Sequence, residues 1–138
     1  MTANEQFQRG VALFNAHKFF EAHEAWEELW LLEPEPEKTF LQGLIQLAAA
    51  FHHYRRGNSR GAKSLLAAGL AKLERFPSRH RGLALEELRA QAAAWVLWLG
   101  GKDGRHPPPR PEVRVLSAKG GHPSRAVPEK MKPRKRRR

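Results

Sequence analysis

A histidine and a glutamate one helical turn apart, His23 and Glu27, are the residues of this sequence best suited to chemistry. The stretch 23–30 around them has no Gly, Pro or β-branched residue, which predicts a helix. At about 100° per residue its apolar side chains gather on one side, and both residues fall inside the apolar arc. A buried charge without a partner is costly, so we expect either a structural pair or a binding site. The arc is formed by Phe19, Ala22, Trp26, Leu29 and Trp30, and it extends to Phe20 and Leu31.

The next predicted helix supplies a second inward histidine, His52, which falls between Leu41 and Ile45 on its helical wheel. A short loop joins the two helices, so they should pack antiparallel, and His52 should then lie at a similar height to His23. We therefore expect a polar pocket between these helices. The candidate ligand-binding residues are His23, Glu27, Trp30, Gln42 and His52.

The candidate metal ligands within this pocket are His23, Glu27 and His52. Two imidazoles and one carboxylate suit a divalent metal such as zinc, and an open coordination position would permit hydrolysis. The same side chains also fit a buried His–Glu pair completed by His52 and Gln42, so both interpretations stay open. A zincin-type protease is excluded, because Glu27 stands where the second histidine of that motif is required.

The composition narrows the class of protein. The chain has 138 residues and no Cys, which predicts one domain and excludes disulfides, thiolate metal sites and thiol nucleophiles. There is no basic leader followed by an apolar run, and no stretch approaches the roughly 20 apolar residues of a spanning helix. We expect a cytoplasmic protein with no membrane contact.

The positive charge is concentrated at the C-terminal end. Residues 1–101 carry 12 Lys/Arg and 11 Asp/Glu, whereas residues 102–138 carry 13 and 3. The second segment is also rich in Pro and Gly and poor in large apolar residues, so we expect a disordered basic tail after a helical domain. Such a tail could contact nucleic acid without sequence preference, because it has no aromatic side chain for stacking.

The pattern of apolar residues predicts an all-α fold without strands. The helices are expected at about residues 4–16, 18–32, 37–56, 59–76 and 83–99, each bounded by Pro, Gly or a capping residue. They should form a compact bundle built from helical hairpins. His17, His80, His106 and His122 fall in loops or in the tail and are expected to be solvated.

Two segments together resemble a known family. They are Phe20-Glu21-Ala22-His23-Glu24-Ala25-Trp26-Glu27-Glu28-Leu29-Trp30 and the following stretch 40–52, and they are similar to the bacterial and archaeal domain-of-unknown-function 309 family. Its hallmark is a His, a Glu four residues later and an aromatic residue three after that, which His23, Glu27 and Trp30 match. The resemblance covers about residues 7–75. It implies a small all-helical fold and a proposed metal-binding role for the motif, with no assigned reaction.

The sequence thus favours a helical domain that binds a divalent metal or small ligand between its second and third helices. The alternative is a helical interaction module whose basic tail, residues 102–138, contacts nucleic acid. The two hypotheses differ in class, since the first places function in a pocket and the second on a surface.

Overall fold

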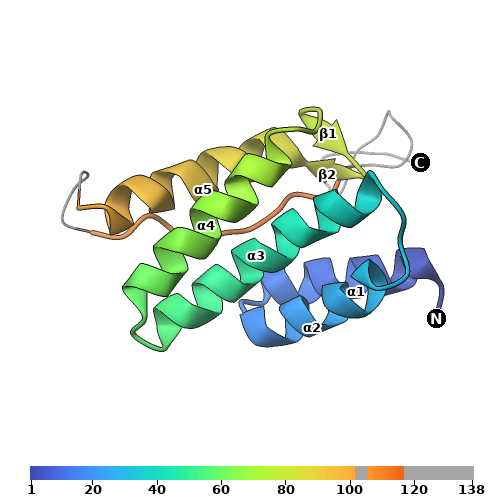
Figure 1. The fold of residues 1–138 in the computed structure, drawn as a ribbon, viewed down its shortest axis with the longest axis horizontal. Coiled ribbons are helices and arrows are strands. Elements are labelled where there is room, and N and C mark those ends of the chain that lie inside the picture. Colours follow the sequence, from blue (N-terminus) through green and yellow to red (C-terminus); the bar gives the residue numbers. More distant parts are fainter. Residues whose placement is uncertain (102–105, 117–138) are drawn as a thin grey trace, which may run out of the picture.

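Five α-helices account for most of the chain in the computed structural model, which describes residues 1–101 and 106–116 (Figure 1). The all-α prediction is confirmed for this part of the chain. Most helix ends lie within three residues of the predicted ones, and successive helices pair as antiparallel hairpins. The helices are α1 (Ala3–Asn15), α2 (Phe19–Trp30), α3 (Glu37–Arg55), α4 (Ser59–Leu73) and α5 (Leu85–Leu99).

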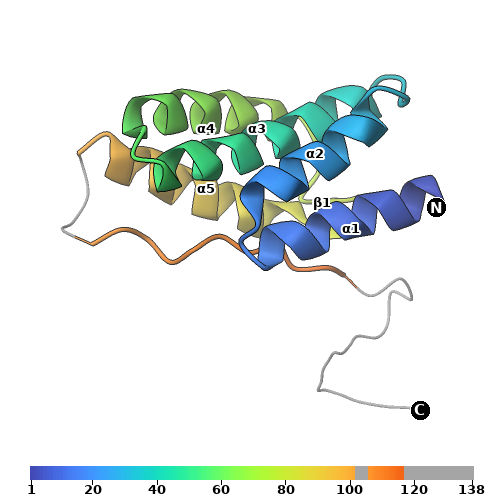
Figure 2. The ribbon, with the colours of Figure 1, turned by 90° about the horizontal axis from the view of Figure 1, so that it is seen from below.

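Helix α3 lies at the centre, packed against α2 on one side and α4 on the other (Figure 2). Its contact with α4 is close because two glycines face each other: a Cβ on Gly69 would lie 2.8 Å from the carbonyl oxygen of Gly43. The core beneath α3 is aromatic. Phe51 packs edge-on against Trp95 of α5, and Phe14 of α1 packs edge-on against Phe51.

A two-residue hairpin between α4 and α5 corrects the expectation of no strands. Strand β1 (Arg79–His80) pairs antiparallel with β2 (Leu83–Ala84), and the turn holds Arg81 and Gly82 at positive φ, 50° and 78°. Two residues are too short for any alternation of apolar and polar side chains, so periodicity could not reveal these strands. The hairpin shortens α5 at its start, which is Leu85 rather than Leu83.

Residues 106–116 belong to the predicted basic tail, and the structure shows them packed against the helices. They run back along α5 as an extended segment, toward the hairpin (Figures 1 and 2), and Val113 is buried with 2% of its surface exposed. A Pro-rich composition rules out regular helix but does not prevent packing, because an extended backbone can hydrogen-bond to side chains. The rest of the predicted tail, residues 102–105 and 117–138, lies outside the described residues.

Among the helices of the described residues, none combines the length and the hydropathy needed to cross a lipid bilayer.

Candidate functional site

The rotation of α2 decides which of its side chains can form a site, and Trp26 fixes that rotation. Its indole is 1% exposed and lies directly on Gly10 of α1, where an added Cβ would be 2.2 Å from Nε1. The Nε1–H donates to the carbonyl of Phe7 at 3.2 Å. The buried side of α2 is therefore centred between Ala22 and Leu29, both of which are buried.

This rotation corrects the predicted position of Glu27, which is exposed rather than inside the apolar arc. The arc was drawn too wide, because Phe20 and Leu31 were counted among its members. In the structure Phe20 is 46% exposed and Leu31 is 66% exposed, so both mark the outer side of α2. Glu27 follows Phe20 by about two helical turns and therefore points in nearly the same direction. Glu24 is also exposed.

His23 and His52 do approach each other, through a shared aromatic neighbour. The His23 ring stacks on Phe20 with a centroid separation of 6.0 Å, and the His52 ring lies 5.1 Å from the same Phe20 centroid. Both histidines are half-buried, and Nδ1 of His23 is buried without a hydrogen-bond partner among the described residues. The antiparallel register predicted for α2 and α3 is confirmed by these contacts.

The surroundings of His52 disfavour the protonated form of its imidazole. Burial lowers the pKa of His52 below 6.5, and the positive charges of Arg56, His53, His23 and Arg55 lower it further. No carboxylate contributes to this shift. Among the described residues, no hydrogen bond or ion pair joins Glu27 to His23 or to His52, and Glu27 is exposed.

The predicted metal ligands do not converge as a ready-made site. Within residues 1–101 and 106–116, no group of three or more His, Cys, Asp or Glu side chains is arranged to hold a metal ion. His23 and His52 share one side of the helix pair, but Glu27 points to the outer face. A structural zinc site needs four protein ligands and a catalytic one needs three, so these residues do not fit a preformed centre.

The other end of the same helix pair is closed by Trp30 and Lys38. The ammonium group of Lys38 lies 4.1 Å from the Trp30 ring centroid and donates to the Trp30 carbonyl. Trp30 is half-buried, and its Nε1–H is buried without a partner among the described residues. Gln42, one turn beyond Lys38 on α3, is also half-buried. Thus His23, Trp30, Gln42 and His52 follow one line, which we call the α2–α3 seam.

Beside the seam lies a surface on which apolar and acidic side chains are mixed. Phe20, Glu24, Glu27 and Leu31 follow one another at helical spacing, and all are exposed. Leu32, just after the helix, is 82% exposed. Glu21 and Glu28 flank the row on its other side and are exposed too. We call this row with its flanking residues the α2 outer face.

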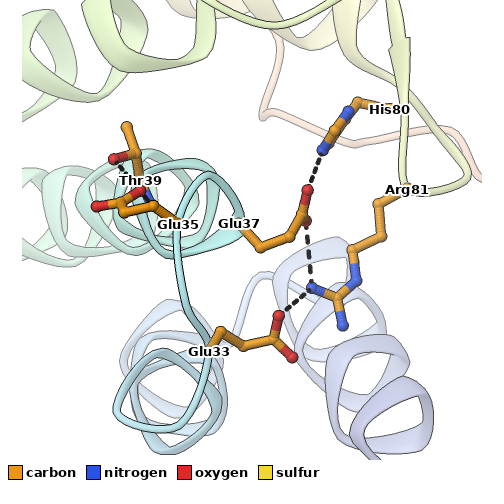
Figure 3. Close-up of polar contacts among 6 residues, drawn as sticks. All are labelled: Glu33, Glu35, Glu37, Thr39, His80 and Arg81. Carbon is orange, nitrogen blue, oxygen red and sulfur yellow. Dashed lines mark hydrogen bonds and ion pairs between the residues drawn. The ribbon is translucent and has the colours of Figure 1, made fainter.

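A separate cluster of charged side chains, shown in Figure 3, joins the start of α3 to the hairpin. His80 Nε2 lies 2.7 Å from an oxygen of Glu37. The Arg81 guanidinium bridges Glu37 and Glu33 at 3.4 and 3.5 Å, and it lies 4.6 Å from the Phe7 ring centroid. These four charged residues line a shallow recess of about 260 Å³. We call them the hairpin corner.

The hairpin corner is built as a structural connection. Both of its carboxylates are already engaged by Arg81 or His80, and the His80 ring packs against Phe40 at 4.5 Å and Phe76 at 5.0 Å. It therefore anchors the hairpin to the first half of the fold.

Sequence reasoning missed this cluster and treated His80 as solvated, although it is half-buried. The partners are 43 residues apart, and the only sequence signal was a run of Glu residues before α3. One of that run, Glu35, points away from the corner (Figure 3), and hydrogen bonds from Thr39 lower its pKa.

The remaining histidines and basic residues have local roles. His17 is half-buried at the end of α1 with φ of 63°, which corrects the expectation that it is solvated, whereas His106 is exposed as predicted. His122 lies outside the described residues. Arg55 donates to the His17 carbonyl and lies 5.0 Å from the Phe19 ring centroid. Arg55 therefore ties the end of α3 to the turn between α1 and α2.

The α2–α3 seam lies within the part of the chain that matches a family of unknown function. The family model described as "Domain of unknown function (DUF309)" matches residues 7–65, which confirms the predicted resemblance over that range. All five predicted ligand-binding residues fall inside it. The hairpin corner and residues 106–116 extend beyond it.

Two relatives are similar over about half of this chain. An uncharacterized protein of Aquifex aeolicus (strain VF5) is 35% identical over 78 residues, which cover 56% of this chain and 23% of that protein. The uncharacterized protein YpuF of Bacillus subtilis (strain 168) is 42% identical over 71 residues, covering 51% of this chain and 38% of YpuF. This chain therefore spans well under half the length of either relative.

Proposed function

We propose that this chain is a helical interaction module, and that the α2 outer face with the adjoining seam binds a basic, amphipathic helical segment of a partner protein. The observation that carries the proposal is the mixture of exposed apolar and acidic side chains along one row of α2. Within the described part of the chain, the structure gives no carboxylate partner to the seam histidines His23 and His52, whereas the exposed row gives a surface on which binding can be argued.

The α2 outer face leaves large apolar side chains in water, which is energetically costly. Phe20, Leu31 and Leu32 are 46%, 66% and 82% exposed, and they account for half of the large apolar side chains exposed in the described part of the chain. Covering such side chains releases roughly 25 cal/mol per Å² of apolar surface. Exposed apolar groups gathered on one element, with polar residues around them, are typical of protein-binding surfaces.

The acidic residues on and near α2 favour a positively charged partner. Residues 19–37 contain seven Glu and no Lys or Arg. Two of these, Glu33 and Glu37, are engaged by Arg81, and the others remain on or near the α2 outer face and its following loop. Complementary charge raises association rates and excludes acidic competitors, so a basic partner fits.

This chain's own basic segment fits only half of that requirement. Residues 117–138 carry nine Lys/Arg and one Glu, but their only larger apolar side chains are one Val and one Met. They match the charge of the α2 outer face without matching Phe20, Leu31 and Leu32. A partner segment that carries both Lys/Arg and Leu-type residues fits both features.

The seam supplies hydrogen-bonding groups at the edge of this surface. The buried Nε1–H of Trp30 can only donate, and Nδ1 of His23 can donate or accept according to tautomer. Both atoms have almost no exposed surface, so a bound helix would reach them only after the side chains that cover them move. Such contacts would fix the register of a bound helix.

The test uses a probe peptide of stated chemistry, a helical Leu/Lys amphipath about 14 residues long, titrated into the full chain by calorimetry. We expect binding that weakens at least tenfold in a Phe20→Ser/Leu31→Ser variant. Leu97→Ser is the matched control, because Leu97 is a 50% exposed leucine on α5, and it should change nothing. An oligo-lysine peptide of equal charge should bind more weakly. Equal binding by the double variant would contradict the proposal.

A second candidate function rests on charge alone. The basic excess of residues 117–138 suits contact with nucleic-acid phosphates, and Arg56 and Arg60 are exposed at the turn between α3 and α4. Such binding would be sequence-independent and strongly salt-dependent. It would use a different surface from the α2 outer face, so the two functions are compatible.

A further inference from the structure

The groove between α1, β2 and α5 holds residues 109–116 through contacts to their main chain. The side-chain amide of Asn15 receives the Val113 N–H at 2.8 Å and donates to the Val113 carbonyl at 2.9 Å. Gln91 of α5 does the same for Glu112, at 2.8 and 2.7 Å. Glu112 and Val113 are thus each hydrogen-bonded at both the N–H and the carbonyl of their main chain, by side chains on opposite sides of the groove.

The hairpin and α5 extend this recognition in both directions. The Ala84 N–H donates to the Arg114 carbonyl at 2.9 Å, and Leu83 forms an antiparallel bridge with Val115. At the other end the Trp95 indole donates to the Pro109 carbonyl at 3.0 Å. Main-chain pairing to a strand edge together with side-chain amide clamps is how proteins bind extended peptides.

The burial of alternate side chains adds sequence preference to these main-chain contacts. Val113 is 2% exposed and Pro111 is also buried, whereas Glu112 between them points outward. Arg114 makes a two-pronged contact with Glu87 of α5, with its shortest distance 2.6 Å. The groove therefore distinguishes a Pro-x-Val-Arg pattern, with alternate residues buried as an extended segment requires.

We infer that this groove is a peptide-binding site for an extended Pro-x-Val-Arg segment, filled by residues 111–114 of the same chain and able to accept the same segment of a second copy. A second copy is the partner that fits this site, because it carries the same Pro-x-Val-Arg segment. Exchange of an identical element between two copies needs no new contact chemistry. The inference is independent of the α2 outer face.

The first test asks whether the segment behaves as a ligand. A protease site is inserted between Gly101 and His106 of the full chain, the chain is cleaved, and the fragment that begins at His106 is followed by size exclusion. We expect the fragment to stay bound and to be displaced by excess peptide of sequence 106–116. The matched peptide with Val113→Asp should displace it at least tenfold less well. Loss of the fragment with no rebinding of the peptide, or equal displacement by both peptides, would overturn the inference.

The second test asks whether a second copy supplies the segment. Deleting residues 102–105 in the full chain brings Gly101 directly before His106, which leaves too little chain for the segment to return along its own α5. The mass in solution is then measured by light scattering. We expect a dimer, and a monomer when Asn15→Ala and Gln91→Ala are added to remove the clamps. If that deletion does not fold, mixing two differently tagged, cleaved chains measures exchange directly. A folded monomer, or no exchange between tagged chains, would overturn the inference.

Discussion

Replacing Gly10 by Ala tests the contact that sets the direction of every side chain on α2. In a solvent-exposed helix this change normally stabilises a protein by about 0.5–1 kcal/mol, because Ala restricts the unfolded chain. Here the new Cβ would meet Trp26 Nε1 at 2.2 Å and Cδ1 at 2.4 Å. The indole is 1% exposed and packs between Phe7 and Phe14, so it has no free space to retreat into.

The expected magnitude follows from three terms. Overpacking a buried site costs about 1–3 kcal/mol, and moving the indole from the Phe7 carbonyl loses a hydrogen bond worth about 1 kcal/mol. The gain in helix propensity offsets about 1 kcal/mol of this loss. We expect Gly10→Ala to lower the free energy of unfolding by about 2 kcal/mol, measured by urea denaturation with far-UV circular dichroism.

The control isolates the propensity term. Ala12→Gly lies on the same helix at an exposed position and should cost about 1 kcal/mol. Adding Trp26→Phe to Gly10→Ala should cost less than the two single changes together, because the smaller ring relieves the clash. A Gly10→Ala protein that is as stable as the wild type, or more stable, would refute the contact and with it the assigned rotation of α2.

Three further predictions concern titration and the C-terminal region. The NMR titration midpoint of His52 should lie below 6.5, and Arg56→Gln should raise it. Because the pKa is lower in the folded state, protonation of His52 favours unfolding. Its effect on the free energy of unfolding is absent above about pH 6.5 and grows as the pH falls below that value. The hydrogen bond from Arg114 lowers the pKa of Glu87, so this exposed pair should add up to about 1 kcal/mol to the free energy of unfolding above pH 4.5. That contribution should be lost as the pH falls through the lowered pKa. Acid denaturation of the Glu87→Gln variant should not show this loss. Deleting residues 117–138 should change the free energy of unfolding by less than about 0.5 kcal/mol and abolish RNA binding measured by anisotropy at low salt; undiminished RNA binding would move that site to the folded surface.

The helices and the meeting of His23 with His52 could be predicted because both depend on local patterns. Pro and Gly punctuate the helix ends, and a short loop forces α2 and α3 to pack antiparallel. Glu27 was misplaced for a physical reason. A helical wheel treats every apolar residue as buried, whereas Phe20 and Leu31 are exposed on the outer side of α2. Composition alone cannot separate a core stripe from an exposed apolar row.

The hairpin corner and the packed segment 106–116 depend on contacts between distant residues. The partners of His80 and Val113 lie 43 and 98 residues away, beyond any periodic signal. Pro-rich composition correctly excluded helix for 106–116 but said nothing about side-chain amides that could satisfy an extended backbone. From the sequence, Asn15 is only a polar residue at a helix end. Its role in holding the main chain of Val113 can be seen only in the structure.

The interaction surface proposed for α2 is tested most directly by mapping where the Leu/Lys probe peptide binds, with amide chemical shifts of the full chain. We expect the largest shifts at residues 19–32 and along the seam on α3, with few on α4 and α5. The Phe20→Ser/Leu31→Ser variant should show small shifts at the same probe concentration, and Leu97→Ser should match the wild type. Shifts centred away from α2, or unchanged in the double variant, would contradict the assignment of α2 as the binding surface.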